Sequence, residues 1–207
     1  MSLIFYRAPM STATITELVL AELGVPHEVV TVDIRKGEST RVEYLKLNPN
    51  GKVPTVVHDG TAIWESAAIT MYLGETFGVE KKLYPAPGLR RGEAMKWIVW
   101  TNVTLGDAVS RWTRNTMSWT PAEQHNALAA EAAKADMASC LRILDDALDG
   151  RQFLCGEYSI VDTHVNSYVD WLRHMQVDMK PYPRLAAWGE RCCARPAYTR
   201  VMAADKK

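Results

Sequence analysis

The chain changes character near residue 80, and this change limits the folds open to it. Before that point short β-rich runs alternate with helical stretches, whereas no run after residue 88 has the composition of a strand. Residues 78–88 carry two prolines and end in glycine, a composition typical of a linker. The pattern predicts a small α/β domain over residues 1–80, followed by an all-helical domain over residues 90–207.

The first part predicts a mixed four-stranded sheet with helices packed on it. Asp59-Gly60 lies between two short β-rich runs, which is the signature of a tight hairpin, and Gly24 is a suitable residue to end a helix. The elements expected, in chain order, are strand Leu3–Tyr6, helix Thr12–Leu23, strand His27–Val32, helix Thr40–Leu47, strands Thr55–His58 and Thr61–Trp64, and helix Glu65–Phe77.

The second part predicts a bundle of helices. Thr120-Pro121-Ala122-Glu123 has the residues of a complete helix start, and Ser159-Ile160-Val161-Asp162 resembles a capping box. The helices expected are Arg90–Met117, in which Gly106 is a candidate bend, then Thr120 to Leu148, Ser159 to about Met175, Arg184–Cys193 and a short helix from Pro196.

Composition excludes several classes of function. The 207 residues include 24 Lys and Arg and 24 Asp and Glu, and this balance argues against a nucleic-acid partner because binding a polyanion rests on a basic excess. No apolar run approaches the ~20 residues of a membrane span, and the start lacks the pattern of a signal peptide. We therefore expect no membrane partner.

The four cysteines form no C-x-x-C pair and no cluster with zinc spacing. Free thiols are typical of a reducing compartment, so a cytoplasmic protein is expected. No metal site is predicted, because the five histidines are scattered and pair with no Cys or Asp at a suitable spacing.

Three short segments could carry chemistry. In the turn from Tyr6 to Thr12, Ser11 or Thr12 would cap the first helix, whose free N–H groups favour an anion, although capping alone also explains these residues. Val53-Pro54 could present the Val53 backbone to an extended ligand if the bond were cis. Glu65-Ser66 opens a helix, where the carboxylate could hold an ammonium and the hydroxyl a carboxylate, or where Glu simply complements the helix dipole.

Taken in order, these segments resemble the cytosolic glutathione transferases along the whole chain. Asn48-Pro49-Asn50-Gly51-Lys52-Val53-Pro54 with Glu65-Ser66 resembles the glutathione site of the thioredoxin-like domain, and Ser159–Asp162 resembles a motif of the helical domain. One departure follows that motif: Thr163 stands where the family usually has an apolar residue that completes a hydrophobic staple, which weakens the expected helix start.

The resemblance implies a glutathione site. Val53 would pair through its backbone with the cysteinyl part, with Pro54 in cis, while Glu65 and Ser66 would hold the γ-glutamyl end. Lys52, and less directly Lys36 or Arg35, would neutralise the glycine carboxylate.

The resemblance leaves three candidates for the residue that activates the thiol. Ser11 falls where the serine-type classes keep their activating serine, Tyr6 where the tyrosine-type classes keep theirs, and Thr12 where the bacterial beta class keeps a cysteine. The absent cysteine counts against cysteine-based thiol transfer. Ser11 is preferred, although Thr-Ala-Thr follows it in place of the Cys-Arg often seen in the serine-type classes. For Tyr6, core packing is the alternative interpretation.

The resemblance implies an enzyme that activates glutathione for attack on a hydrophobic electrophile, with peroxidase, isomerase or dehalogenase activity equally compatible. A catalytically inactive binding or interaction module is the alternative, because the fold alone does not imply activity. A homodimer is the family expectation. The electrophile would lie between the domains, near aromatic, Met and Arg side chains that otherwise belong to the core or surface: Trp97, Trp100, Trp112, Trp119, Met117, Arg111 and Arg114.

Overall fold

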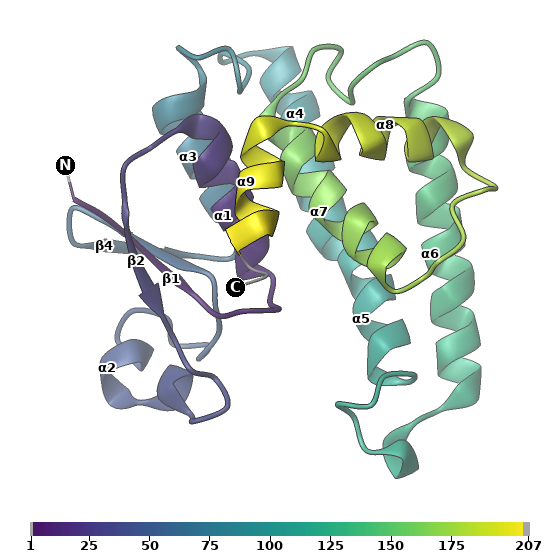
Figure 1. The fold of residues 1–207 in the computed structure, drawn as a ribbon, viewed down its shortest axis with the longest axis horizontal. Coiled ribbons are helices and arrows are strands. Elements are labelled where there is room, and N and C mark those ends of the chain that lie inside the picture. Colours follow the sequence, from purple (N-terminus) through teal and green to yellow (C-terminus); the bar gives the residue numbers. More distant parts are fainter. Residues whose placement is uncertain (1, 205–207) are drawn as a thin grey trace.

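A computed structural model describes residues 2–204 and contains one four-stranded sheet (Figure 1). The strands are β1 (Leu3–Arg7), β2 (Glu28–Thr31), β3 (Thr55–His58) and β4 (Thr61–Trp64). They lie in the order β2-β1-β3-β4. β1 runs parallel to β2 and antiparallel to β3, which in turn pairs antiparallel with β4, so the sheet is mixed, as predicted.

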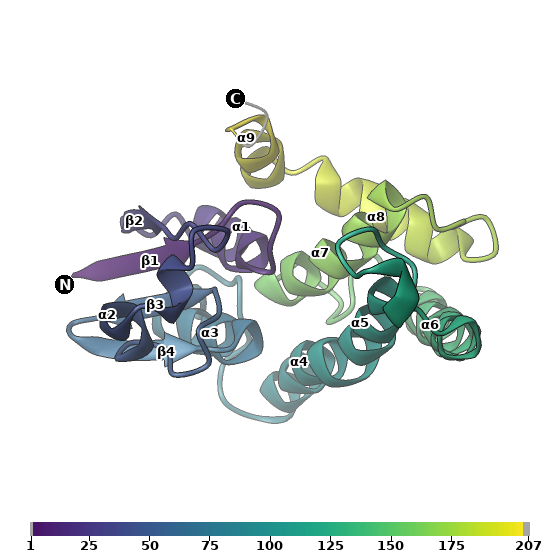
Figure 2. The same cartoon turned by 90° about the horizontal axis from the view of Figure 1, so that it is seen from below.

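Two helices of this part lie between the sheet and the helical part, as Figure 2 shows. They are α1 (Ala13–Leu23) and α3 (Ser66–Leu73), and α3 continues into a π-helical turn over Gly74–Gly78. The short helix α2 (Val42–Leu45) lies below the strands in the view of Figure 1, and its Tyr44 hydroxyl lies 2.9 Å from Oγ1 of Thr55 at the start of β3. The sheet and the helices together form the thioredoxin-like arrangement that the resemblance implied.

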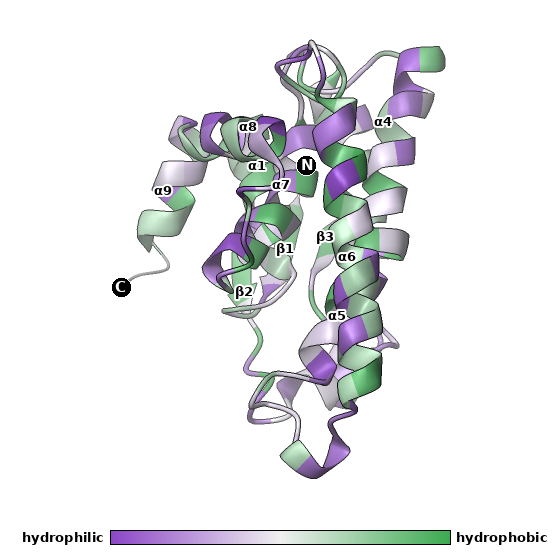
Figure 3. Ribbon diagram, turned by 90° about the vertical axis from the view of Figure 1, so that its right-hand side faces the viewer, coloured by the Kyte–Doolittle hydropathy of each residue, from purple (hydrophilic) through white to green (hydrophobic). Residues whose placement is uncertain are grey.

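Helices joined by loops and turns form the second part of the described chain. They are α4 (Leu89–Trp100), a π-helical segment (Thr101–Leu105), α5 (Gly106–Arg114), α6 (Ala127–Ala147), α7 (Ile160–His174), α8 (Pro183–Cys193) and α9 (Pro196–Ala204). Helix α6 carries both apolar and polar residues (Figure 3). Its buried residues, such as Met137, Leu141 and Leu144, recur at helical spacing, so the helix has one buried face. No helix within residues 2–204 combines the length and apolar composition needed to cross a membrane.

Helix α7 lies at the centre of the helical part and packs against α1. Its apolar residues Val161, Val165 and Val169 are fully buried, as is Trp188 of α8. Farther along, Arg195 donates two hydrogen bonds to Glu22 of α1, at 2.7 and 2.8 Å. Burial and this ion pair hold the last helices against the sheet-bearing part.

The prediction of one helical run from Arg90 to Met117 is confirmed as far as Arg114, and its predicted end is wrong. The run includes the π-helical segment Thr101–Leu105, and Gly106, the candidate bend, begins α5 directly afterwards. A Cβ at Gly106 would lie 3.1 Å from the Thr101 carbonyl oxygen and 3.2 Å from the Tyr168 hydroxyl. The lack of a side chain at Gly106 therefore lets Tyr168 of α7 pack closely against this helix.

The predicted helix start at Thr120 is also wrong. Residues 122–124 form only a short 3₁₀ turn, and α6 begins at Ala127 after Asn126. Asn126 Oδ1 accepts a 3.0 Å hydrogen bond from the Ala129 N–H, which caps the helix. A proline at N1 and a glutamate at N3 favour a helical turn but do not extend it without such a cap at the right place.

The start of α7 has the predicted capping box. Asp162 accepts from the Ser159 N–H at 3.0 Å, and Ser159 Oγ accepts from the Val161 N–H at 3.3 Å. Thr163, at the position of the expected weakness, shares a 2.7 Å hydrogen bond with the Tyr158 hydroxyl. A polar pair thus links the two positions that a hydrophobic staple would join.

Candidate functional site

Strand register brings the three candidate segments to one edge of the sheet. Tyr6, near the end of β1, pairs with Thr55 at the start of β3, and Thr55 pairs with Trp64 at the end of β4. Ser11 follows β1, Pro54 precedes β3 and Glu65 follows β4, so the three segments meet. We call the following residues the sheet-edge site: Ser11, Thr12, Val53, Pro54, Glu65 and Ser66.

A buried asparagine shapes the loop that leads to Val53. Asn48 is 2% exposed, and its amide donates to the Lys52 carbonyl at 2.8 Å and to Thr55 Oγ1 at 3.1 Å. The hydroxyl of Tyr44 donates to the same carbonyl at 2.7 Å. The Val53-Pro54 bond that follows is cis, as the resemblance implied. Among residues 2–204 none accepts a hydrogen bond from the Val53 N–H.

Glu65 and Ser66 differ in exposure although they are neighbours. Glu65 is exposed and has φ 71°, a backbone conformation uncommon for a residue other than glycine and often found at binding sites. Within the described residues its carboxylate has no ion-pair partner. Ser66 begins α3 and is 5% exposed, and the first N–H groups of α3 have no partner within the helix.

The basic candidates differ in their partners. Lys52 is exposed at the end of the loop and joins no ion pair with another described residue, whereas Lys36 lies 3.3 Å from Asp33. The pKa of Asp33 is lowered, first by the hydrogen bond that its carboxylate accepts from the Lys36 backbone N–H and then by the Lys36 side chain. Arg35 is exposed beside them. Lys52 is thus the cation with the fewest competing contacts.

The three candidates for thiol activation have different surroundings. Ser11 Oγ donates to the Ala8 carbonyl at 2.7 Å and accepts from the Ala13 N–H at 3.2 Å, so it closes the turn before α1. Thr12 is exposed, and its hydroxyl lies 3.4 Å from the Val53 carbonyl oxygen. The Tyr6 ring packs edge-on against Tyr44, with centroids 5.8 Å apart.

A chain of hydrogen bonds behind the site joins both parts of the molecule. Asn102, in the π-helical segment, donates to Ser66 Oγ at 2.9 Å. Its Oδ1 lies 2.7 Å from Nε2 of His164 in α7, and Nδ1 of that histidine lies 2.9 Å from Thr70 Oγ1 in α3. Complete burial lowers the pKa of His164 to about 3, so the ring is neutral.

Sequence reasoning missed Asn102, His164 and Thr70. In the sequence the five histidines are scattered without a Cys or Asp partner, and Asn102 and His164 are 62 positions apart, so no local pattern links these residues. A signal was present in α7, where His164 and Asn166 interrupt a run of buried valines.

Tyr168 is a further residue near the site. Burial raises the pKa of its phenol to about 12, and the charge of Glu65 adds to this effect. The phenol is thus neutral and lies within electrostatic range of the sheet-edge site.

Two family models match the chain. That for the N-terminal domain of glutathione S-transferases matches residues 1–75, and that for the C-terminal domain matches residues 105–196. The chain belongs to the glutathione S-transferase family. Its two matched segments contain the sheet with α1 and α3, and α5 to α8, respectively.

Relatives in this family match the chain over nearly its whole length. Glutathione S-transferase GstB of Escherichia coli K12 is 30% identical over 188 residues, which is 89% of each chain. Disulfide-bond oxidoreductase YfcG of the same strain is 29% identical over 201 residues, covering 93% of this chain and 90% of that protein. The glutathione transferase URE2P8 of Phanerochaete chrysosporium, solved with oxidized glutathione, is 25% identical, with a TM-score of 0.90 over 99% and 95% of the two chains.

The aromatic candidates of this family member divide between core and surface. Trp97 is buried and packs edge-on against Trp100, with centroids 5.6 Å apart, whereas Trp119 is 63% exposed. Trp112 is partly buried against the core. Arg111 is paired with aspartates on both sides, at 2.8 Å to Asp107 and 2.7 Å to Asp136, while Arg114 and Met117 lie near the end of α5.

The cysteines lie outside the sheet-edge site. Cys140, Cys155 and Cys192 are buried, and burial raises the pKa of the Cys155 thiol to about 12. Cys193 is partly exposed at the end of α8, and burial raises the pKa of its thiol as well. None of these thiols has the lowered pKa of a reactive cysteine.

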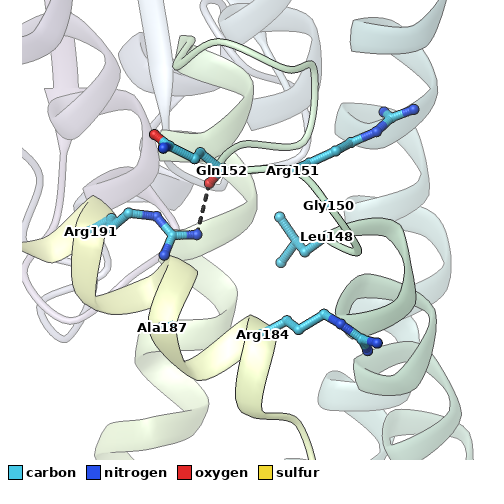
Figure 4. A pocket seen from close by; sticks show the side chains of 7 residues that line it. All are labelled: Leu148, Gly150, Arg151, Gln152, Arg184, Ala187 and Arg191. Carbon is cyan, nitrogen blue, oxygen red and sulfur yellow. Dashed lines mark hydrogen bonds between the residues drawn. The ribbon is translucent and has the colours of Figure 1, made fainter.

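A cavity of about 370 Å³ lies between the end of α6 and α8 (Figure 4). It is lined by Arg151, Arg184 and Arg191, and it shares no residue with the sheet-edge site. Arg184 lies 3.0 Å from Asp145, and Arg191 donates to the Gln152 carbonyl at 2.9 Å. These contacts already pair part of the positive charge that lines the cavity.

Proposed function

We propose that the chain binds glutathione at the sheet-edge site and lowers the pKa of its thiol for attack on an apolar electrophile. The observation that carries this proposal is the pairing of Tyr6 with Thr55 and of Thr55 with Trp64, which gathers the three segments at one edge. Family membership supports the choice of ligand, as does the oxidized glutathione with which URE2P8 was solved.

The proposed binding contacts match the free groups of the site. The Val53 N–H would pair with the cysteinyl backbone, since the cis bond precedes β3 and no described residue uses this donor. Glu65 would hold the γ-glutamyl ammonium, while Ser66 and the start of α3 would hold the adjacent carboxylate. Lys52 would neutralise the glycine carboxylate, with Lys36 or Arg35 behind it.

Activation requires modest energy. A free thiol has a pKa of ~8.5, and bringing it to about 6.5 takes roughly 2.7 kcal/mol of differential stabilisation. A hydrogen bond to a charged group supplies ~1.5–3 kcal/mol, and a helix N-terminus ~0.3–1 kcal/mol. A hydroxyl at the start of α1 together with its N–H groups would suffice. Ser11 is our first candidate, with Thr12 and Tyr6 behind it.

The electrophile would lie on the helical side of the sulfur. Tyr168 and one or two of the tryptophans of α4 and α5 would form an apolar, aromatic-rich surface there. Holding the electrophile against the thiolate then supplies the rest of the rate by proximity.

A second candidate function is glutathione binding without activation. The observation that favours it is the Ser11 hydroxyl, which donates to the Ala8 carbonyl at 2.7 Å and must turn away from this acceptor to reach a thiolate. Binding by Glu65, Ser66 and Val53 would be unaffected by that bond.

A conjugation assay separates the two functions. The purified chain is mixed with reduced glutathione and a panel of aromatic halides, epoxides and hydroperoxides, after calorimetry has measured glutathione binding. Binding with product formation above the uncatalysed rate supports the transferase, and binding with no turnover on any substrate favours the binding module. No binding would reject both.

A further inference from the structure

The buried Thr70 hydroxyl fixes the direction of the hydrogen bonds behind Ser66. Thr70 is fully buried, and within residues 2–204 its Oγ1 has one hydrogen-bond partner, His164 Nδ1, at 2.9 Å. A hydroxyl proton in such a place needs an acceptor, since leaving it unpaired is costly. His164 Nδ1 is therefore the acceptor and carries no proton.

The protonation of His164 in turn determines how the Asn102 amide is oriented. A neutral imidazole with an unprotonated Nδ1 carries its proton on Nε2, and this N–H points at Asn102 Oδ1, 2.7 Å away. The oxygen of the Asn102 amide therefore faces the histidine, so its NH₂ group faces Ser66. The amide nitrogen donates to Ser66 Oγ at 2.9 Å.

The Ser66 hydroxyl is thereby set as a donor to whatever occupies the site. Its oxygen already accepts from Asn102, and no described residue accepts its own proton. A hydroxyl in this state suits a ligand carboxylate, which can only accept. We infer that Asn102 is a positioning residue for the γ-glutamyl carboxylate of glutathione, and that His164 and Thr70 hold its amide in the one orientation that keeps the Ser66 proton for the ligand.

The irregular helix supports this role. Asn102 lies in the π-helical segment Thr101–Leu105, and such segments often occur at functional sites. The segment connects α4 with α5 and turns the Asn102 side chain toward α3 and α7. Gly106 then allows Tyr168, one turn after His164, to pack against the same segment.

The inference rests on the proposed glutathione binding, and a double-mutant cycle tests the two separately. Reduced glutathione is titrated calorimetrically into the full chain and into Ser66→Ala, Asn102→Ala and the double variant. Asn102→Ala is expected to weaken binding about tenfold, as for the loss of one hydrogen bond. In the Ser66→Ala background the same change is expected to have no further effect, because Asn102 acts through Ser66.

A second variant tests the direction of the bonds. Asn102→Asp keeps the shape, but its carboxylate accepts from both His164 and Ser66, so the Ser66 proton turns away from the ligand. Binding is expected to weaken more than in Asn102→Ala. The control is Ser110→Ala, an exposed position on α5, which is expected to leave the dissociation constant unchanged. Thermal unfolding of each variant checks that it is folded before its affinity is compared.

The outcomes separate the two proposals. Failure of the unaltered chain to bind glutathione would overturn the proposed function and this inference with it. Three results would overturn the inference alone, provided that the unaltered chain binds glutathione. The first is unchanged affinity in Asn102→Ala, and the second is full affinity in Asn102→Asp. The third is a double variant in which the effects of Ser66→Ala and Asn102→Ala multiply.

Discussion

The amide nitrogen of Asn102 lies 2.9 Å from the hydroxyl oxygen of Ser66 and joins the helical part of the molecule to the edge of the sheet. Ser66 belongs to α3, which packs on the sheet, and Asn102 belongs to the segment between α4 and α5. The helical part therefore contacts the sheet-edge site from behind, although the proposed ligand contacts come from the first part alone.

Replacement of Glu65 is expected to weaken glutathione binding without loss of stability. The Glu65 side chain is exposed and has no ion-pair partner within the described residues, so Glu65→Ala removes only the contact proposed for the ligand ammonium. A hydrogen bond to a charged group is worth ~1.5–3 kcal/mol, which corresponds to a loss of affinity of roughly 10- to 150-fold. Calorimetric titration measures this loss. Glu131→Ala, an exposed position on α6, is the matched control, and equal affinity in both variants would reject the assignment.

Replacement of Ser11 is expected to affect stability and rate separately. Ser11→Ala removes the bonds to Ala8 and Ala13, which is expected to cost ~0.5–2 kcal/mol of unfolding free energy, as for a helix cap. If the hydroxyl also stabilises the thiolate, the conjugation rate falls ~10²–10³-fold, as for the loss of an oxyanion donor. Urea unfolding and initial rates at a temperature where both proteins are folded measure the two effects. Thr12→Ala is measured beside it as the second candidate, and a larger rate loss there would move the activating role to Thr12.

The cap of α6 is expected to depend on Asn126 and not on Thr120. Asn126→Ala removes the bond from the Ala129 N–H and is expected to lower the free energy of unfolding by ~1 kcal/mol. Thr120→Ala is expected to change it by less than about 0.5 kcal/mol, as at an ordinary surface position. Chemical denaturation of the two variants makes the comparison. A greater loss for Thr120→Ala would contradict the observed start of the helix.

His164 is expected to make the fold sensitive to acid. Burial lowers its pKa to about 3 in the folded chain, against about 6.5 when unfolded. Between these values the unfolded chain binds a proton that the folded chain does not, so the free energy of unfolding falls as the pH falls, by at most about 1.4 kcal/mol per pH unit. In His164→Gln this contribution is absent. Denaturation curves at pH 7 and pH 5 are therefore expected to show a smaller acid loss in the variant, and equal losses would contradict a buried neutral histidine.

Local signals predicted the sheet well. The hairpin of β3 and β4 has the predicted bounds, because Asp59 and Gly60 both adopt the positive φ that a tight turn requires, 45° and 84°. The capping box before α7 was also predicted, because Ser159 and Asp162 act within one helical turn. Where a few neighbouring residues determine the backbone conformation, the sequence is sufficient to predict it.

Features that depend on distant contacts were not predictable from the sequence. The π-helical segment at residues 101–105 was not expected, and it lies beside the close approach of Tyr168 to Gly106, a contact between two helices. The false start at Thr120 has a local cause instead, because the capping pattern there competes with the nearby cap Asn126. The network of Thr70, His164 and Asn102 exists only once α3, α7 and the π-helical segment have packed together.

The proposed activity depends on stabilisation of the thiolate of bound glutathione, which a pH titration of its ultraviolet thiolate absorbance in the complex would detect. We expect an apparent thiol pKa of about 6.5, against about 8.5 for the free thiol. Saturating binding with an apparent pKa equal to that of free glutathione would contradict activation and leave a binding protein.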